Sequence, residues 1–340
     1  MNRRGFLVSA AGVLACGRGG RRLNVYNWSD YVAPDTIPNF EREFGVRVRY
    51  GTYESAPEML AKVMSGNSGW DVVFPSAEFV QPMRDMGLLA PLRHDLLTNL
   101  DALGPLFRDP PWDRELAWSV PYMHGTTGIV YRKGILPEPK AWADLWDARL
   151  RGRITMLDDP PEVFGACLKK IGDPLNSADP GQLREAKAQA VLQKPLLRAY
   201  LNAEVRDQLV AGDVAAAQAW AVTAGQAIAA APGKLEYVLP VEGFARYADT
   251  MAILRETGRM ELASQFINYL LRPEVSAAIV GATQTATANA AALKLLPAAV
   301  REDPVLYPPA EELARGEWFQ PQSAASQRLR DRLWTEIKSS

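Results

Sequence analysis

The side chains best suited to binding chemistry lie in one short run, residues 23–31, with the sequence L-N-V-Y-N-W-S-D-Y. The run begins like a β-strand, because aromatic and β-branched residues suit a pleated surface. It ends in a polar and aromatic cluster made of Trp28, Ser29, Asp30 and Tyr31. An aromatic face attracts a cation, and a neighbouring carboxylate supplies the opposite charge. The run therefore suggests a cation site at the end of a strand; the alternative is a core aromatic beside a solvated aspartate.

A second acidic motif, D-D-P-P-E at residues 158–162, follows a predicted strand at 152–157. As local structure it is typical of a helix start, with Asp159 as the cap, prolines in the first turn and Glu162 three residues later as in a capping box. Carboxylates at the end of a strand are also exposed to any ligand at that edge of the sheet, so the two interpretations are compatible. As a hydrolase pair the two acids would usually lie too close together to flank a sugar.

Three further residues are candidate ligand contacts, although a purely structural role would also explain each of them. Trp220 ends an alanine-rich predicted strand, and Tyr247 and Asp249 lie between two apolar segments. Taken alone, Trp220 fits a core position better than a ligand contact. For Tyr247 and Asp249 the sequence leaves both interpretations open.

Motifs for other chemistries are missing from the sequence. There is no phosphate-binding G-x-x-x-x-G-K-S/T loop, no G-x-G-x-x-G after a strand and no G-x-S-x-G elbow. The two histidines, His94 and His124, are not spaced with each other or with cysteine as zinc ligands are. Cys167 would be the only cysteine left beside Cys16, so no internal disulfide is expected. We predict no metal and no cofactor.

The elements that must position these residues alternate between strand and helix. Apolar periodicity predicts helices at 34–44 and 57–64 and strands at 46–50 and 70–74, so the first hundred residues follow a β-α-β-α-β pattern. Such alternation is typical of a mostly parallel sheet with helices on both faces. The remaining expected elements are two strands near 118–122 and 128–131, helices at 142–146, 160–170 and 201–210, a strand ending at Trp220, and a mainly helical region after 260.

Composition limits the possible partners. The chain has 340 residues, of which 48% are hydrophobic and 23% charged, and its formal net charge is −1. These values fit a globular protein of about two domains. A near-neutral chain has no global basic field for nucleic acid or an anionic membrane surface.

The first 22 residues have the features of an export signal and a short tether. Arg3 and Arg4 precede an apolar stretch that ends in V-L-A-C at residues 13–16. Paired arginines followed by Phe-Leu are similar to a twin-arginine signal, and V-L-A-C is similar to a lipobox with Cys16 as the lipidated residue. The alternative is an ordinary secretory signal with an incidental cysteine.

From Leu23 to about Leu333 the chain resembles the spermidine/putrescine-binding proteins of bacterial polyamine ABC importers. The resemblance rests on an ordered series of motifs: Y-N-W-S-D-Y at 26–31, T-Y-E-S-A-P-E-M at 52–59, W-D-V-V-F-P-S at 70–76, W-A-D-L-W at 142–146, D-D-P-P-E-V-F at 158–164, I-N-Y-L-L-R-P-E-V at 267–275 and G-E-W at 316–318. Their common order over nearly the whole chain makes the resemblance specific.

The resemblance implies an α/β, two-lobed, type II periplasmic-binding fold with mixed, mostly parallel sheets and a ligand cleft between the lobes. After a signal peptide and tether at 1–22, lobe 1 would comprise 23–124 plus 249–294. Lobe 2 would comprise 125–248 plus 295–340. A hinge between them would close the cleft.

In the family, aromatic side chains enclose the methylene chain and carboxylates bind the ammonium groups. By position, the resemblance implies a ligand site made of Trp28, Ser29, Asp30, Tyr31, Ser76, Glu78, Asp159, Glu162, Trp220, Tyr247, Asp249 and Phe319. Three of these depart from the family pattern. Glu78 stands where an aromatic residue is usual, Tyr247 replaces a tryptophan and Phe319 replaces a glutamine.

We therefore expect a non-catalytic, monomeric binding protein that is exported to the periplasm or cell surface, anchored by lipid at Cys16, and passes a polyamine to the permease of an ABC transporter. An alternative ligand is another organic cation or small amine. An alternative from a different class is an exported carboxylate-dependent hydrolase, which turnover of a substrate would reveal.

Overall fold

The computed structural model describes residues 21–135 and 137–340. The predicted signal peptide and Cys16 lie outside these residues. In the described part of the chain, no helix has the length and apolar character needed to cross a membrane.

The chain begins with the predicted alternation of strands and helices, which is confirmed. Its elements are β1 (Arg22–Trp28), α1 (Thr36–Phe44), β2 (Arg47–Tyr53), α2 (Ala56–Met64), β3 (Val72–Val73) and α3 (Ala77–Asp85). Strand β1 pairs in parallel with both β2 and β3. Their carboxyl ends therefore meet at one edge of the sheet, where Trp28 and the turn before α3 lie side by side. Strand β3 is shorter than expected because only Val72 and Val73 pair with β1.

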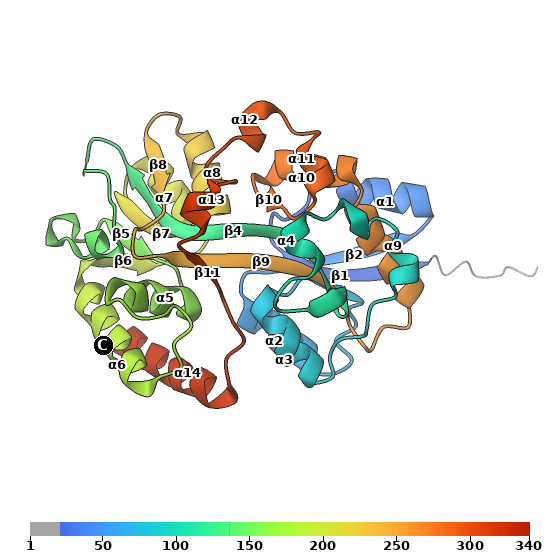
Figure 1. Ribbon diagram of the computed structural model, residues 1–340, viewed down its shortest axis with the longest axis horizontal. Helices are drawn as coiled ribbons and strands as arrows, with labels where there is room; N and C mark the ends of the chain where they lie inside the picture. The colour runs from blue at the N-terminus through green and yellow to red at the C-terminus, as the bar shows by residue number, and fades with distance from the viewer. Residues whose placement is uncertain (1–20, 136) are drawn as a thin grey trace, which may run out of the picture.

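Two long antiparallel strands join the halves of the molecule (Figure 1). They are β4 (Ser119–Arg132) and β9 (Phe244–Ile253). The expectation of two separate strands near 118–122 and 128–131 was wrong, since β4 is continuous through the polar residues between them. Pairing explains why: residues 119–126 bond to β9, and residues 127–132 bond to β7 and β8. At Gly125 a Cβ would lie 2.3 Å from the Tyr247 hydroxyl oxygen, so glycine lets this ring rest on the strand.

The second half contains strands β5 (Ile154–Met156), β6 (Leu197–Tyr200), β7 (Ala216–Trp220) and β8 (Leu235–Val238). Its helices are α5 (Pro160–Lys170), α6 (Pro180–Gln193), α7 (Val205–Ala211) and α8 (Ala221–Ala230), with a 3-10 helix at Trp142–Trp146. The helix expected at 201–210 begins later, at Val205, because Leu201 still continues the pairing of β6 with β5 and donates its amide to the Met156 carbonyl oxygen at 2.9 Å.

The C-terminal region is mainly helical, as predicted. It comprises α9 (Met260–Leu270), α10 (Pro273–Thr283), β10 (Ala286–Thr287), α11 (Ala290–Leu293), α12 (Ala298–Arg301), α13 (Ala310–Leu313), β11 (Gly316–Trp318) and α14 (Ala324–Ser339). A further short helix, α4 (Pro105–Arg108), precedes β4. The central path of the sheet has the order β2-β1-β3-β9-β4-β7-β5-β6.

Buried apolar side chains form separate cores on the two sides of the molecule. One core is built from residues 23–123 and 248–288, and we call this side lobe 1. Two adjoining cores lie among residues 129–337, and we call that side lobe 2. In Figure 1 helices α2 and α3 cover the lower face of lobe 1, while α5, α6 and α14 cover that of lobe 2. Among the described strands, β4 and β9 alone cross between the lobes as long strands, an arrangement suited to a hinge.

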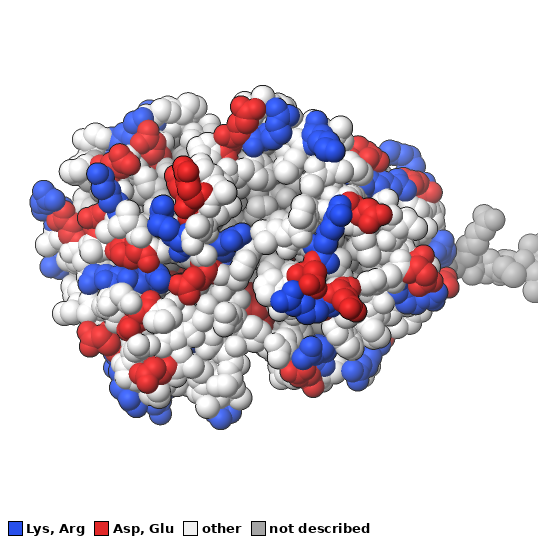
Figure 2. All heavy atoms as spheres, in the orientation of Figure 1, with Lys and Arg blue, Asp and Glu red and all other residues white. Residues whose placement is uncertain are grey.

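The surface seen in Figure 2 mixes basic and acidic side chains. Neither sign covers a large continuous area of this face, and a notch separates the two lobes at its lower edge. This distribution agrees with the net charge of −1.

Candidate functional site

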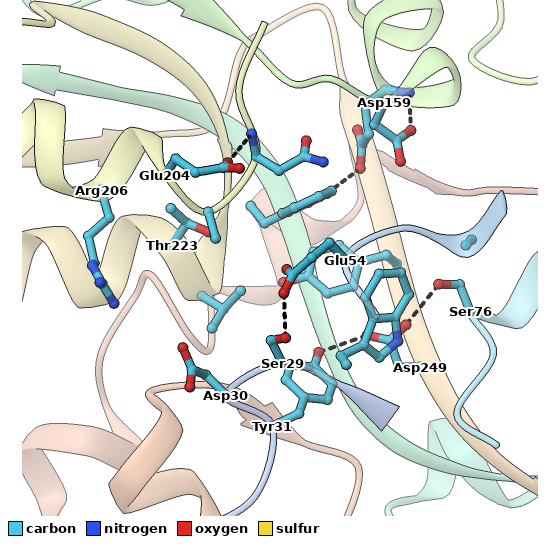
Figure 3. A pocket seen from close by; sticks show the side chains of 18 of the residues that line it. Ser29, Asp30, Tyr31, Glu54, Ser76, Asp159, Glu204, Arg206, Thr223 and Asp249 are labelled. Carbon is cyan, nitrogen blue, oxygen red and sulfur yellow. Dashed lines mark hydrogen bonds between the residues drawn. The ribbon is translucent and has the colours of Figure 1, made fainter. Parts of the chain in front are cut away.

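A pocket of about 490 Å³ lies between the two lobes (Figure 3). All twelve residues predicted for the ligand site line it: Trp28, Ser29, Asp30, Tyr31, Ser76, Glu78, Asp159, Glu162, Trp220, Tyr247, Asp249 and Phe319. They come from strand ends, from the first turns of α3 and α5, and from β9, which passes beneath the pocket. Residues as far apart in sequence as Trp28 and Phe319 are thus brought to one cavity.

Asp249 is the most buried carboxylate on the lobe 1 side of the pocket, with 5% of its surface exposed. It accepts hydrogen bonds from the Tyr31 hydroxyl at 2.7 Å and the Ser76 hydroxyl at 2.8 Å. Tyr31 is held in turn, because its backbone carbonyl accepts a bond from the Tyr122 hydroxyl at 2.6 Å. Burial raises the pKa of Asp249 to about 6. Two hydroxyl donors therefore fix the orientation of a carboxylate that forms no ion pair with any residue the structure describes.

Glu162 is the corresponding buried carboxylate of lobe 2. Its Oε1 accepts hydrogen bonds from the Thr127 hydroxyl at 2.8 Å and the Trp220 indole nitrogen at 2.9 Å. Asp159 caps α5 by accepting from the Glu162 amide at 3.2 Å, as the sequence predicted. The reciprocal bond of a capping box is not among the bonds of Glu162, whose side chain turns to Thr127 and Trp220 instead. Burial raises the pKa of both carboxyl groups.

Glu78, the clearest departure from the family pattern, lies in the first turn of α3 and lines the pocket. Burial raises the pKa of Glu78 to about 8, and the negative charges of Asp249 and Asp159 act in the same direction. The described structure records no hydrogen bond or ion pair from another side chain to this carboxyl group. A positively charged ligand would relieve the repulsion among these groups.

Aromatic rings line the pocket together with the acidic groups. The Trp28 indole donates to the Phe74 carbonyl oxygen at 3.0 Å and its ring packs against Tyr53. Because Trp28 and Trp220 are each held by a hydrogen bond from the indole nitrogen, their faces are presented in fixed orientations. A fixed aromatic face binds a methylene chain or a cation with little loss of side-chain entropy.

The exposed end of the pocket has acidic residues that the sequence analysis missed. Glu54 follows β2 and accepts a hydrogen bond from the Ser29 hydroxyl, and Glu204 and Asp207 project from lobe 2. Asp30 adopts a left-handed backbone conformation with φ of 53°, which aspartate tolerates better than most residues. Glu54 could have been found from its place directly after a predicted strand, within T-Y-E-S-A-P. Glu204 and Asp207 gave no such signal, because residues 201–210 were predicted to be helix.

Taken together, eight carboxylate side chains line the pocket, and Arg206 is the single basic side chain among its described lining residues. The described residues include no group of three or more His, Cys, Asp or Glu side chains arranged to hold a metal ion. His124 does not line this pocket; it packs against Phe107, and burial lowers its pKa to about 4. The pocket is therefore suited to an elongated organic cation with more than one positive charge.

Known proteins are similar to this chain over most of its length. A family model described as bacterial extracellular solute-binding protein matches residues 36–308. The chain is 34% identical to the putrescine-binding periplasmic protein PotF of Escherichia coli strain K12, with 94% of this chain and 92% of that protein covered. It is also 34% identical to the spermidine/putrescine-binding periplasmic protein of the same strain, with 93% of each covered.

Solved structures show the same architecture. A putative spermidine/putrescine ABC transporter from Listeria monocytogenes superposes with a TM-score of 0.90 and 31% identity, covering 94% of this chain and 99% of that one. The two-lobed fold expected from the sequence is thus confirmed. This protein belongs to the bacterial extracellular solute-binding protein family.

Proposed function

We propose that this protein is the solute-binding component of an ABC importer and that it captures a polyamine of the spermidine/putrescine class between its lobes. The observation that supports this most directly is the pocket itself, which is lined by eight carboxylate side chains and by aromatic rings held in place by hydrogen bonds. The relatives named above for binding putrescine or spermidine support the same ligand class.

A polyamine is chemically complementary to this pocket. It is a flexible rod in which ammonium groups are separated by methylene groups. Each buried methylene contributes about 0.8 kcal/mol. Ammonium groups donate to carboxylates in charge-assisted hydrogen bonds, and Asp249 and Glu162 are oriented to accept them. The twelve predicted residues are proposed as the ligand contacts, with Glu54 added at the exposed end.

The two lobes are proposed to close around the ligand. Lobe 1 would comprise residues 23–124 and 249–294, and lobe 2 residues 125–248 and 295–340. The separation of the buried cores along the chain supports these boundaries. The hinge would be formed where β4 and β9 pass between the lobes, near Gly125 and Tyr247.

The remaining expectations follow from the family and from the first residues of the sequence. The protein is proposed to be exported and anchored to the membrane by lipid at Cys16. It is proposed to have no enzymatic activity and to act as a monomer that delivers its ligand to a membrane permease. Export through the twin-arginine route is proposed from Arg3 and Arg4.

The test is native mass spectrometry of freshly purified protein, followed by calorimetry with putrescine and spermidine. We expect a co-purified polyamine, one bound molecule per chain, and a ligand whose mass is unchanged after release. A bound amine of another class would correct the ligand. A ligand released in chemically altered form would favour a hydrolase, and the absence of binding by any cationic amine would refute the proposal.

A further inference from the structure

Arg206 is a basic side chain in a pocket that is otherwise acidic. It lies in the first turn of α7 and lines the pocket. Its Nε bonds to the carboxylate of the adjacent Asp207 at 3.1 Å, and 41% of its side chain is exposed. Its two terminal nitrogens form no hydrogen bond or ion pair with any other described residue. Part of its guanidinium charge therefore remains available to the pocket.

The backbone around Arg206 is tied to the binding site. The Asn202 side chain accepts a hydrogen bond from the Asp158 amide at 3.0 Å, next to Asp159. The Asn202 amide donates to the Glu204 carboxylate, also at 3.0 Å. These contacts join the start of α7 to the strand end that bears Asp159. Arg206 is thus held at the pocket by the same loop structure that positions an acidic contact.

Arg206 lies at the end of the pocket opposite the buried carboxylates of lobe 1. Figure 3 shows it on the side away from Asp249 and Ser76, near the segment that bears Glu204. A ligand whose first ammonium pairs with Asp249 would extend from there along the aromatic walls. Only a longer ligand would bring a further ammonium to the end where Arg206 lies.

Building on the proposed polyamine function, we propose that Arg206 is a specificity-determining residue that weakens the binding of ligands with a third or fourth positive charge. Like charges repel, and the repulsion grows with the number of ligand charges near the guanidinium. A diamine held at the buried end is affected least. The preference among polyamines would then depend on two opposing effects at this end of the pocket: repulsion of a ligand ammonium by Arg206 and its attraction to the acidic side chains.

A different possibility is that Arg206 closes the pocket by pairing with a lobe 1 carboxylate such as Asp30 or Glu54. No such ion pair is formed among the residues that the structure describes. An ion pair between the lobes would strengthen the binding of every ligand alike, because it would favour the closed state. The two possibilities therefore predict opposite effects when the charge is removed.

The test is calorimetry on Arg206→Gln with putrescine, spermidine and the tetraamine spermine. We expect the ratio of spermidine to putrescine affinity to rise by about threefold or more, and the ratio for spermine to rise further. The increases in both affinity ratios should be smaller at about 0.5 M salt, because salt screens the interaction between exposed charges. Arg206→Lys keeps the charge and should keep ratios near those of the wild type.

Arg198→Gln is the matched control, because Arg198 is in the same lobe, pairs with Asp213 at 3.7 Å and does not line the pocket. It should leave all three affinities unchanged. An equal change for all ligands in Arg206→Gln, in either direction, or no change, would overturn the inference. A wild-type protein that binds none of these amines would instead refute the proposed function, so the two failures are distinguishable.

Discussion

Replacing Asp249 with asparagine should weaken ligand binding and at the same time stabilise the unliganded protein. The substitution keeps the size of the side chain but removes a charge that is 95% buried, since Asp249 is 5% exposed. Truncating one partner of a desolvated charge pair costs about 2–5 kcal/mol. At about 1.4 kcal/mol for each tenfold change, polyamine affinity should fall by roughly 30-fold to several thousand-fold.

The effect on stability has the opposite sign because of the pKa of Asp249. Burial raises that pKa from 3.8 to about 6, so between these values the folded protein binds a proton that the unfolded chain releases. Stability therefore falls as the pH rises through this window, and the full cost of the buried charge is present above about pH 6. Asparagine removes the cost, so the unliganded variant should unfold at a higher temperature than the wild type near neutral pH. The difference should disappear at about pH 4.

Calorimetry at neutral pH and thermal unfolding across this pH range test both parts. Asp71→Asn is the matched control, because Asp71 is 1% exposed, accepts from the Asn24 amide at 2.8 Å and pairs with Arg259 at 3.2 Å outside the pocket. It should lower stability and leave affinity unchanged. A loss of less than about twofold in Asp249→Asn would place Asp249 outside the ligand contacts. A lower unfolding temperature near neutral pH would refute the argument from burial.

Three further predictions follow from other residues. Spermidine should bind more tightly than putrescine, because its additional ammonium group balances the charge of Glu78, a carboxyl group whose pKa is raised to about 8. Glu78→Gln should therefore narrow the difference in affinity between the two amines, and equal affinities in the wild type would contradict this prediction. A polyamine should change tryptophan emission, and the change should vanish when Trp28 and Trp220 are both replaced by phenylalanine; a change retained in that variant would contradict their role as ligand contacts. Cys16→Ser should release the protein from membranes without altering affinity, whereas a wild-type protein recovered in the soluble fraction would argue against the lipid anchor.

The sequence alone determined the elements whose form depends on neighbours along the chain. The β-α alternation of the first hundred residues follows from apolar periodicity, and the Asp159 cap follows from D-P-P-E, because a cap bonds to an amide three residues away. Since parallel strands present their carboxyl ends at one edge, residues after those ends could be expected to meet. The resemblance to a known family selected which of them belong to the pocket, and the structure places all twelve there.

Tertiary structure decided the features that depend on contacts between distant segments. Glu162 turns from its expected local partner to Thr127 and Trp220, which belong to other strands of the folded lobe. Strand β4 continues through a polar stretch because it pairs with β9 and then with β7 and β8, which lie far along the chain. Arg206 lines the pocket from the first turn of α7, whose preceding loop is hydrogen-bonded to the segment that follows β5. Local patterns cannot reveal such positions, because long-range packing and hydrogen bonding determine which side chains face a shared cavity.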